Sequence, residues 1–157
     1  MIRRFAPWFG IGALALVGGY LAAFGRDAVT DPVTAGLLAG LAVAGGLSIV
    51  GGVRESVALG PVTLPWNVLV GAADVLAALV VAVSSVRSLW TGGATTAQFA
   101  DAALLVGCGS IAWVGIQIAR DSRHVDLEAS PSRTRLVAIA ALAVASTVGG
   151  ALIATAI

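Results

Sequence analysis

The chain has 157 residues, of which 59% are hydrophobic and 11% are charged, and its mean hydropathy is +1.00. Soluble proteins average roughly 45–50% apolar and about 25% charged residues, so most of this apolar surface must face lipid or other membrane helices. The formal net charge of +1 argues against an electrostatic nucleic-acid binder. The single cysteine, Cys108, excludes an intrachain disulfide and a cysteine metal cluster.

Five apolar stretches are long enough to cross a bilayer, and they lie at residues 8–24, 33–53, 66–86, 99–119 and 136–157. Helix is the expected state, because an isolated strand in lipid would leave its backbone groups unpaired. At 1.5 Å per residue, most of these helices cover a hydrocarbon core of roughly 30 Å, and the first is marginal. We therefore predict one all-α domain, an integral membrane bundle of about five transmembrane helices with short loops.

The first stretch has some features of a signal peptide. A basic "MIRR" start precedes it, and Ala23-Phe24-Gly25 loosely resembles a cleavage site between small residues. Further spans follow, so a retained first helix is the simpler interpretation. Cleavage would leave the orientation of the remaining helices unchanged.

The helix boundaries carry local signals. Asp31-Pro32 reads as an N-cap followed by proline in the first helical turn. Pro61 and Pro65 end the second helix and precede the start of the third. Three of the tryptophans lie at span ends, where aromatic belts form: Trp8, Trp66 and Trp90.

Arginine predicts the orientation. With the N-terminus inside, seven of the nine arginines fall on the inner side, and only Arg26 and Arg87 fall outside. The positive-inside rule then places the chain in the cell membrane with a cytoplasmic N-terminus and an outer C-terminus. Four of the inner arginines flank the loop before the last span and suit anionic lipid headgroups: Arg120, Arg123, Arg133 and Arg135.

Asp74 is the one carboxylate inside the third stretch, "WNVLVGAADVLAALVVAV" (66–83). It lies about 12 Å along the helix from Trp66, near the bilayer centre. A carboxylate there costs roughly 2.5–3.5 kcal/mol on insertion scales, so the apolar surroundings favour the protonated form. Since no arginine reaches this layer, we expect hydroxyl or carbonyl partners, with Ser110, Ser48 and Ser146 as the candidates.

Glycines also gather toward the middle of the spans and are candidates for close helix packing. The alternative is that they allow a helix bend or a small polar cavity. The candidates are Gly36 and Gly40, which form a GxxxG motif, together with Gly45, Gly46, Gly107 and Gly109. Two segments, "AGLLAG" (35–40) and "AALLVG" (102–107), resemble each other, which suggests a duplicated helix pair. The limited alphabet of membrane helices explains that similarity equally well, and we favour this explanation.

Motifs of catalysis and cofactor binding are missing from the sequence, which has no Walker loop, GxGxxG, HExxH or GxSxG. Asp121, His124 and Glu128 could share a helix face and hold a metal, but a solvated helix end explains them better. We therefore expect no enzyme activity, no cofactor and no metal.

Two function classes remain. The first is a non-catalytic structural or accessory subunit that contacts membrane lipids and packs against itself or in a larger membrane complex. The second is a small proton- or ion-coupled transporter or channel that uses Asp74. The first class is preferred, because a single intramembrane carboxylate with no second charged group gives only weak support for coupled transport.

Overall fold

The computed structural model describes residues 2–91 and 95–120. Its elements in chain order are helix α1 (Ile2–Phe24), a 3-10 turn (Gly25–Val29), helix α2 (Pro32–Val53), strands β1 (Ser56–Leu59) and β2 (Val62–Pro65), and helices α3 (Trp66–Trp90) and α4 (Thr95–Ala119). The predicted fifth span, 136–157, lies outside the described residues.

Four of the described helices are long and apolar enough to cross a membrane, and each contains one of the first four predicted stretches. The helices are longer than predicted at some ends. α1 begins at Ile2 and runs through Pro7, α3 continues to Trp90, and α4 begins at Thr95. The prediction stopped where hydropathy fell, whereas the helical backbone continues through the interfacial residues.

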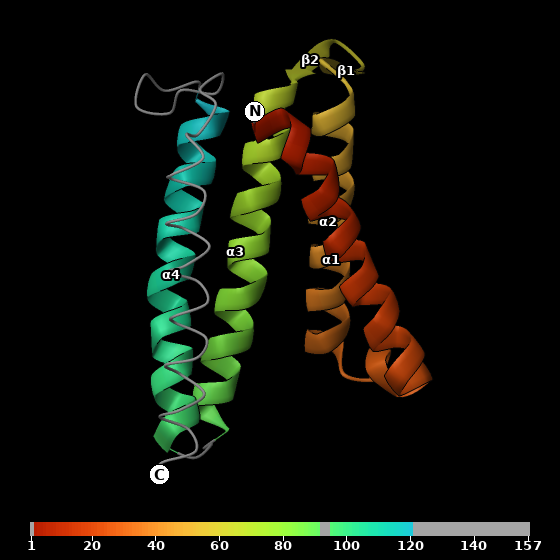
Figure 1. Cartoon of the computed structure of the whole chain (residues 1–157). Coiled ribbons are helices and arrows are strands. Elements are labelled where there is room, and N and C mark those ends of the chain that lie inside the picture. The colour runs from red at the N-terminus through yellow and green to blue at the C-terminus, as the bar shows by residue number, and fades with distance from the viewer. Residues whose placement is uncertain (1, 92–94, 121–157) are drawn as a thin grey trace. The chain divides into compact units, whose positions relative to one another are not determined.

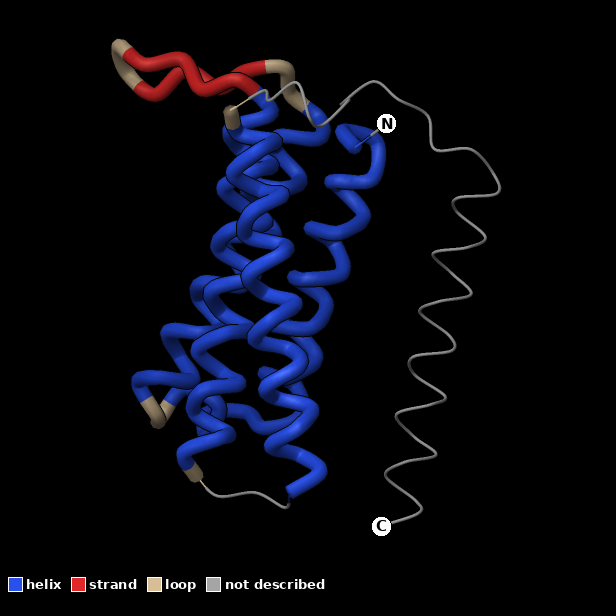
Figure 2. The backbone as a smooth tube through the Cα atoms, turned by 90° about the vertical axis from the view of Figure 1, so that its left-hand side faces the viewer, coloured by secondary structure: helices blue, strands red, loops and turns tan. Residues whose placement is uncertain are grey.

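The helices run alternately down and up, and the chain neighbours pack together (Figures 1 and 2). α1 packs on α2, α2 on α3, and α3 on α4, while α1 makes few contacts with α3. At the end that carries β1 and β2, Ala6, Val70 and Ile118 form a small buried cluster with Trp66 beside it. α1 therefore approaches α3 and α4 at this end and diverges from α3 toward the other end (Figure 1).

The loop between α2 and α3 is a β-hairpin, which the sequence did not predict. β1 and β2 pair antiparallel with Leu59 opposite Val62, so only Gly60 and Pro61 form the turn. Gly60 has a φ of 62°, which glycine adopts without strain, and glycine at the first central position is typical of two-residue hairpin turns. Arg3 binds Glu55 at 3.4 Å and so ties the start of α1 to the base of this hairpin.

The two helix pairs cross through the same kind of glycine contact. A methyl group added at Gly10 of α1 would lie 2.4 Å from the carbonyl oxygen of Gly45 in α2. A methyl group added at Gly71 of α3 would likewise lie 2.4 Å from the carbonyl oxygen of Gly115 in α4. Glycine at each position lets the two backbones touch, as small residues do in membrane helix pairs. In each pair a glycine of the first helix packs on a glycine of the second, so α1–α2 and α3–α4 share one packing arrangement.

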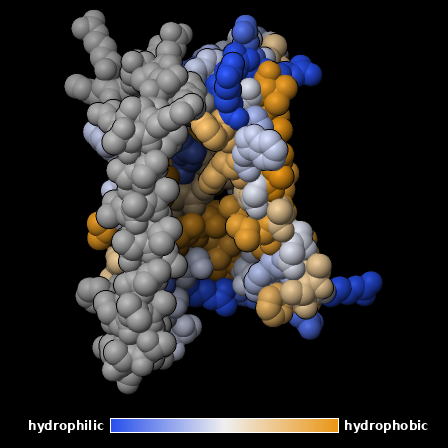
Figure 3. Space-filling model, viewed as in Figure 1, coloured by the Kyte–Doolittle hydropathy of each residue, from blue (hydrophilic) through white to orange (hydrophobic). Residues whose placement is uncertain are grey.

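Hydrophilic residues gather toward the two ends of the visible surface, and hydrophobic residues lie between them (Figure 3). Large apolar side chains are exposed on the helices, including Trp8 at 71%, Leu16 at 69% and Val106 at 76%. Such faces need lipid or other helices as their surroundings.

Candidate functional site

The central cavity lies between the helices and has a volume of about 770 Å³. Three of the helices line it with residues at positions i, i+3, i+4 and i+7, the spacing of one helix face. These faces are Phe9, Gly12, Ala13 and Leu16 of α1; Asp74, Ala77, Ala78 and Val81 of α3; and Leu104, Gly107, Cys108 and Ile111 of α4. Leu41 of α2 and Val80 of α3 complete the lining given by the described residues.

Asp74 is the only charged residue in that lining, and it is partly buried. Asp74 packs closely against α4, because a methyl group added at Gly115 would lie 3.0 Å from the Asp74 Cβ. Ala13 has the matching place in the other helix pair, where its Cβ lies 3.3 Å from a methyl group added at Gly45. Both residues line the central cavity, one from each pair.

The hydroxyl partners expected for Asp74 are placed elsewhere or lie outside the described residues. Ser48 is buried and donates to the Ala6 carbonyl at 2.8 Å, so it joins α2 to α1. Ser110 donates to the Val106 carbonyl of its own helix at 3.5 Å. Ser146 lies outside the described residues. Within residues 2–91 and 95–120, no hydrogen bond to the Asp74 carboxyl is formed, and its oxygens are not sealed from the cavity.

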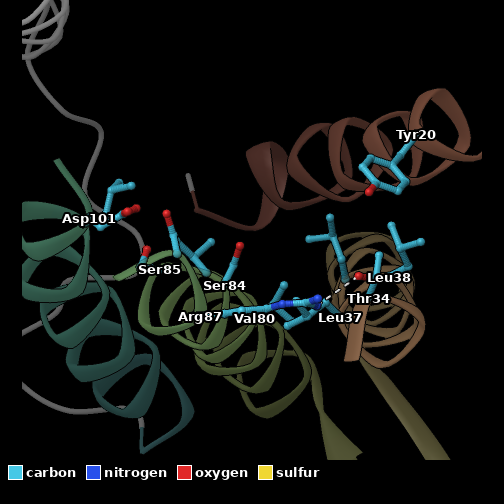
Figure 4. A pocket seen from close by; sticks show the side chains of 13 residues that line it. Tyr20, Thr34, Leu37, Leu38, Val80, Ser84, Ser85, Arg87 and Asp101 are labelled. Atoms are coloured by element: carbon cyan, nitrogen blue, oxygen red, sulfur yellow. Dashed lines mark hydrogen bonds between the residues drawn. The ribbon is translucent and has the colours of Figure 1, made fainter. Parts of the chain in front are cut away.

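A second cavity, the end pocket, continues from the central cavity toward the end of the bundle that carries Arg87. It has a volume of about 470 Å³ and shares Leu41, Val80, Val81 and Leu104 with the central cavity. Its lining is more polar, and Figure 4 shows residues from all four helices around it. The polar and charged residues in this lining are Tyr20, Thr34, Ser84, Ser85, Arg87, Ser88 and Asp101.

An ion pair joins α2 to α3 beside the end pocket. Asp31 caps α2 as predicted, and it accepts from the Thr34 backbone N–H at 3.0 Å and from the Thr34 hydroxyl at 2.6 Å. Arg87 donates to the Asp31 carboxylate and, at 3.2 Å, to the Thr34 hydroxyl. The Thr34 hydroxyl and then Arg87 hold the pKa of Asp31 well below its usual range, because both hydrogen bonds favour the ionised carboxylate.

The glycines named from sequence divide into two groups. Gly45 lies against Gly10, and a methyl group at Gly40 would lie 2.9 Å from the Val80 Cγ2. At the others, no atom of the described residues lies within 4 Å of where a side chain would begin: Gly36, Gly46, Gly107 and Gly109. Gly107 instead lines the central cavity. Sequence could not separate these groups, because the contact depends on how each helix is rotated.

Residues that sequence reasoning did not single out include Gly10, Gly71 and Gly115 at the helix crossings. The Ser84-Ser85 pair in the end pocket was also missed, although two adjacent hydroxyls close to Arg87 in an apolar stretch are a usable signal. Asn67 donates to the Ile118 and Ala119 carbonyls at 3.3 Å each, which joins α3 to the last turn of α4.

The predicted headgroup site is described only in part. Arg120 is exposed after the last turn of α4, and the other three lie outside the described residues: Arg123, Arg133 and Arg135. Asp121, His124 and Glu128 also lie outside them. In the part of the chain that the structure describes, no group of three or more His, Cys, Asp or Glu side chains could hold a metal.

Comparison with known families places the chain in a family. The model of DUF7994, a family of unknown function, matches residues 1–131, so the chain belongs to this family. No curated protein and no solved structure matches the chain.

Proposed function

We propose that this member of DUF7994 is a non-catalytic multi-pass membrane protein that acts as a structural or accessory subunit. The observation that carries the proposal is the apolar exterior of its helices. Phe5, Trp8 and Ile11 of α1 expose 57%, 71% and 51% of their surface, although α1 packs mainly on α2. Such a face can meet lipid, a second copy of the chain or a partner helix without any cost of exposing polar backbone.

We propose the cytoplasmic side for the N-terminus. The end with the β-hairpin carries Arg3, Arg4, Arg54 and Arg120, whereas the opposite end carries Arg26 and Arg87. This asymmetry among the described residues supports the orientation expected from the positive-inside rule. The end pocket then opens toward the outer side.

The accessory role is tested by extracting the full chain from its native membranes in a mild detergent and measuring the mass and composition of the complex. A stoichiometric partner that stays bound through purification is the expected result. Recovery of the chain alone, as a monomer or a homo-oligomer, would contradict the accessory role.

A second candidate function is proton or ion translocation through Asp74. It is favoured by one observation, that Asp74 lines a cavity that continues into the polar end pocket. Asp74→Asn keeps the size of the side chain but cannot ionise, so it should abolish a proton flux in proteoliposomes while the protein still inserts. A wild-type protein without any flux would exclude this candidate.

A further inference from the structure

We propose that the central cavity binds a lipophilic organic cation, with Asp74 as the counter-ion. This inference goes beyond the accessory role and does not depend on it. Three observations carry it: the size and lining of the cavity, the single charge in it, and its place between the two repeated helix pairs.

The cavity has the dimensions of a small-molecule site. Its volume of about 770 Å³ falls within the range of roughly 300–1,000 Å³ that holds drug-sized ligands. Phe9, Leu16, Leu104 and Ile111 give it apolar walls, and small residues such as Gly12 and Ala78 leave room between them. Such a lining accommodates an apolar body and contributes little hydrogen bonding.

The charge selects the class of ligand. Without a partner the apolar surroundings favour the protonated carboxyl, whereas a bound cation favours the carboxylate. The attraction between the two charges is stronger in the cavity than in water, because the local dielectric constant is low. An anion would be repelled, and a neutral apolar molecule would leave the carboxyl without a partner. A cation with apolar substituents satisfies both the walls and the carboxylate.

Calcium or magnesium does not fit the same site. Calcium takes six to eight oxygen ligands and magnesium takes six, whereas Asp74 is the only carboxylate in the described lining. The hydroxyls of Ser48 and Ser110, which could have added oxygen ligands, bind backbone carbonyls in α1 and α4. The ligand must therefore be an organic cation whose charge is surrounded by its own apolar groups, since the described lining does not supply a coordination sphere.

The geometry also gives a route to the site. At the hairpin end Ala6, Val70 and Ile118 pack together, with Trp66 against them, which narrows the space between α1 and the pair α3–α4. At the other end the cavity continues into the end pocket beside Arg87 and Asp101. In many membrane transporters a ligand site likewise lies near the midplane, between two repeats.

Cys108 provides a natural reporter, because it is buried, lines the central cavity and is the only cysteine in the chain. The experiment follows the rate at which N-ethylmaleimide labels Cys108 in the purified full-length chain, with tetraphenylphosphonium as the probe cation. At about ten times the Kd of the cation, labelling should slow roughly tenfold, as expected for a thiol that reacts only in the free state. Triphenylphosphine oxide, which is neutral, and tetraphenylborate, an anion, should protect far less.

Asp74→Asn should raise the cation concentration needed for half-protection by at least about tenfold, because the ionic attraction is lost. Asp27→Asn is the matched control, since Asp27 is exposed and lies outside both cavities, and it should behave as the wild type. Equal protection by the cation and the neutral compound in wild-type protein would overturn the proposal even if Asp74→Asn does not fold. A Cys108 thiol that reacts only after unfolding would overturn it as well, because the cavity would then be closed to ligands.

Discussion

The contact between Gly71 and Gly115 gives the sharpest prediction of stability. In Gly71→Ala, the new methyl group would lie 2.4 Å from the Gly115 carbonyl oxygen and 2.8 Å from the Ala119 backbone nitrogen. Ordinary van der Waals contact begins near 3.4 Å, so α3 and α4 must separate by about 1 Å at this point. The opposing atoms belong to backbone and cannot rotate away as a flexible side chain would.

The cost follows from this separation. Overpacking by one methyl group typically costs about 1–3 kcal/mol, and we expect the upper part of that range because neither backbone can yield locally. A gap of 0.5–1 Å also removes about a quarter to a half of the dispersion energy of neighbouring contacts. The hydrogen bonds from Asn67 to the Ile118 and Ala119 carbonyls lie at the end of the same interface and should weaken with it.

The assay is unfolding of purified protein in mixed micelles with increasing denaturing detergent, followed by helical circular dichroism. Gly109→Ala is the matched control, because Gly109 lies in α4 and a methyl group there would meet no atom of residues 2–91 and 95–120 within 4 Å. It should leave the free energy of unfolding unchanged or raise it by up to about 1 kcal/mol, because alanine favours the helix more than glycine does. If Gly71→Ala and Gly109→Ala unfold at the same detergent fraction, the close approach of the two backbones is wrong.

Three further predictions concern the ends of the helices. Folding lowers the pKa of Asp31, so the stability that Asp31 contributes is complete above its unfolded pKa of about 3.9 and is lost as the pH falls toward the lower folded value. Asp31→Asn should therefore make the free energy of unfolding less sensitive to acid in a series of unfolding curves at decreasing pH. The same loss of stability with acid in the variant and the wild type would contradict this. Asn67→Leu should lower the free energy of unfolding by about 0.6–1.7 kcal/mol, because two carbonyls in α4 lose their donor, and a stability equal to wild type would show that these hydrogen bonds contribute nothing. In a Cys108→Ala background, an impermeant maleimide added to sealed cells should label Asp27→Cys and not Thr63→Cys, and the reverse pattern would overturn the proposed orientation.

The sequence predicted the helices better than their contacts. Hydropathy located the four described helices, and the Asp31-Pro32 pair located the start of α2, because both signals depend on neighbouring residues in the chain. The five-span bundle in one domain stays a prediction, since 136–157 lies outside the described residues. The hairpin was missed because its strands are only four residues each and two prolines suggested an irregular loop.

The candidate site shows more clearly which features the sequence could not predict. Sequence singled out Asp74 as a carboxylate inside an apolar helix, and the structure places it in the lining of the central cavity. The predicted depth of Ser48 and Ser110 did not reveal which way their side chains point. Ser48 satisfies a carbonyl in α1 that is 42 residues away, a partner that only the helix packing can supply. In a chain with 20 glycines, the crossing points at Gly10 and Gly71 likewise depend on helix rotation, which leaves no local mark in the sequence.

The repeat of the two helix pairs bears on why Asp74 is present at all. At one crossing, Gly45 faces Gly10, Ala13 and Leu14, and at the other, Gly115 faces Gly71, Asp74 and Val75. Alanine therefore forms the same contact in α1 that aspartate forms in α3, so the crossing itself does not require a carboxyl group.

Asp74→Ala tests this conclusion. The variant should keep the contact between Gly71 and Gly115 and should unfold at the same detergent fraction as the wild type or later, because Ala13 makes the same contact at the other crossing and alanine brings no polar group into apolar surroundings. The same unfolding assay measures it, with Gly71→Ala as the destabilised reference. A loss of stability as large as that of Gly71→Ala would mean that the carboxyl group is part of the helix packing. Unchanged or increased stability would instead mean that the helix crossing does not need the carboxyl group, which leaves the cavity that Asp74 lines as the place where the carboxyl acts.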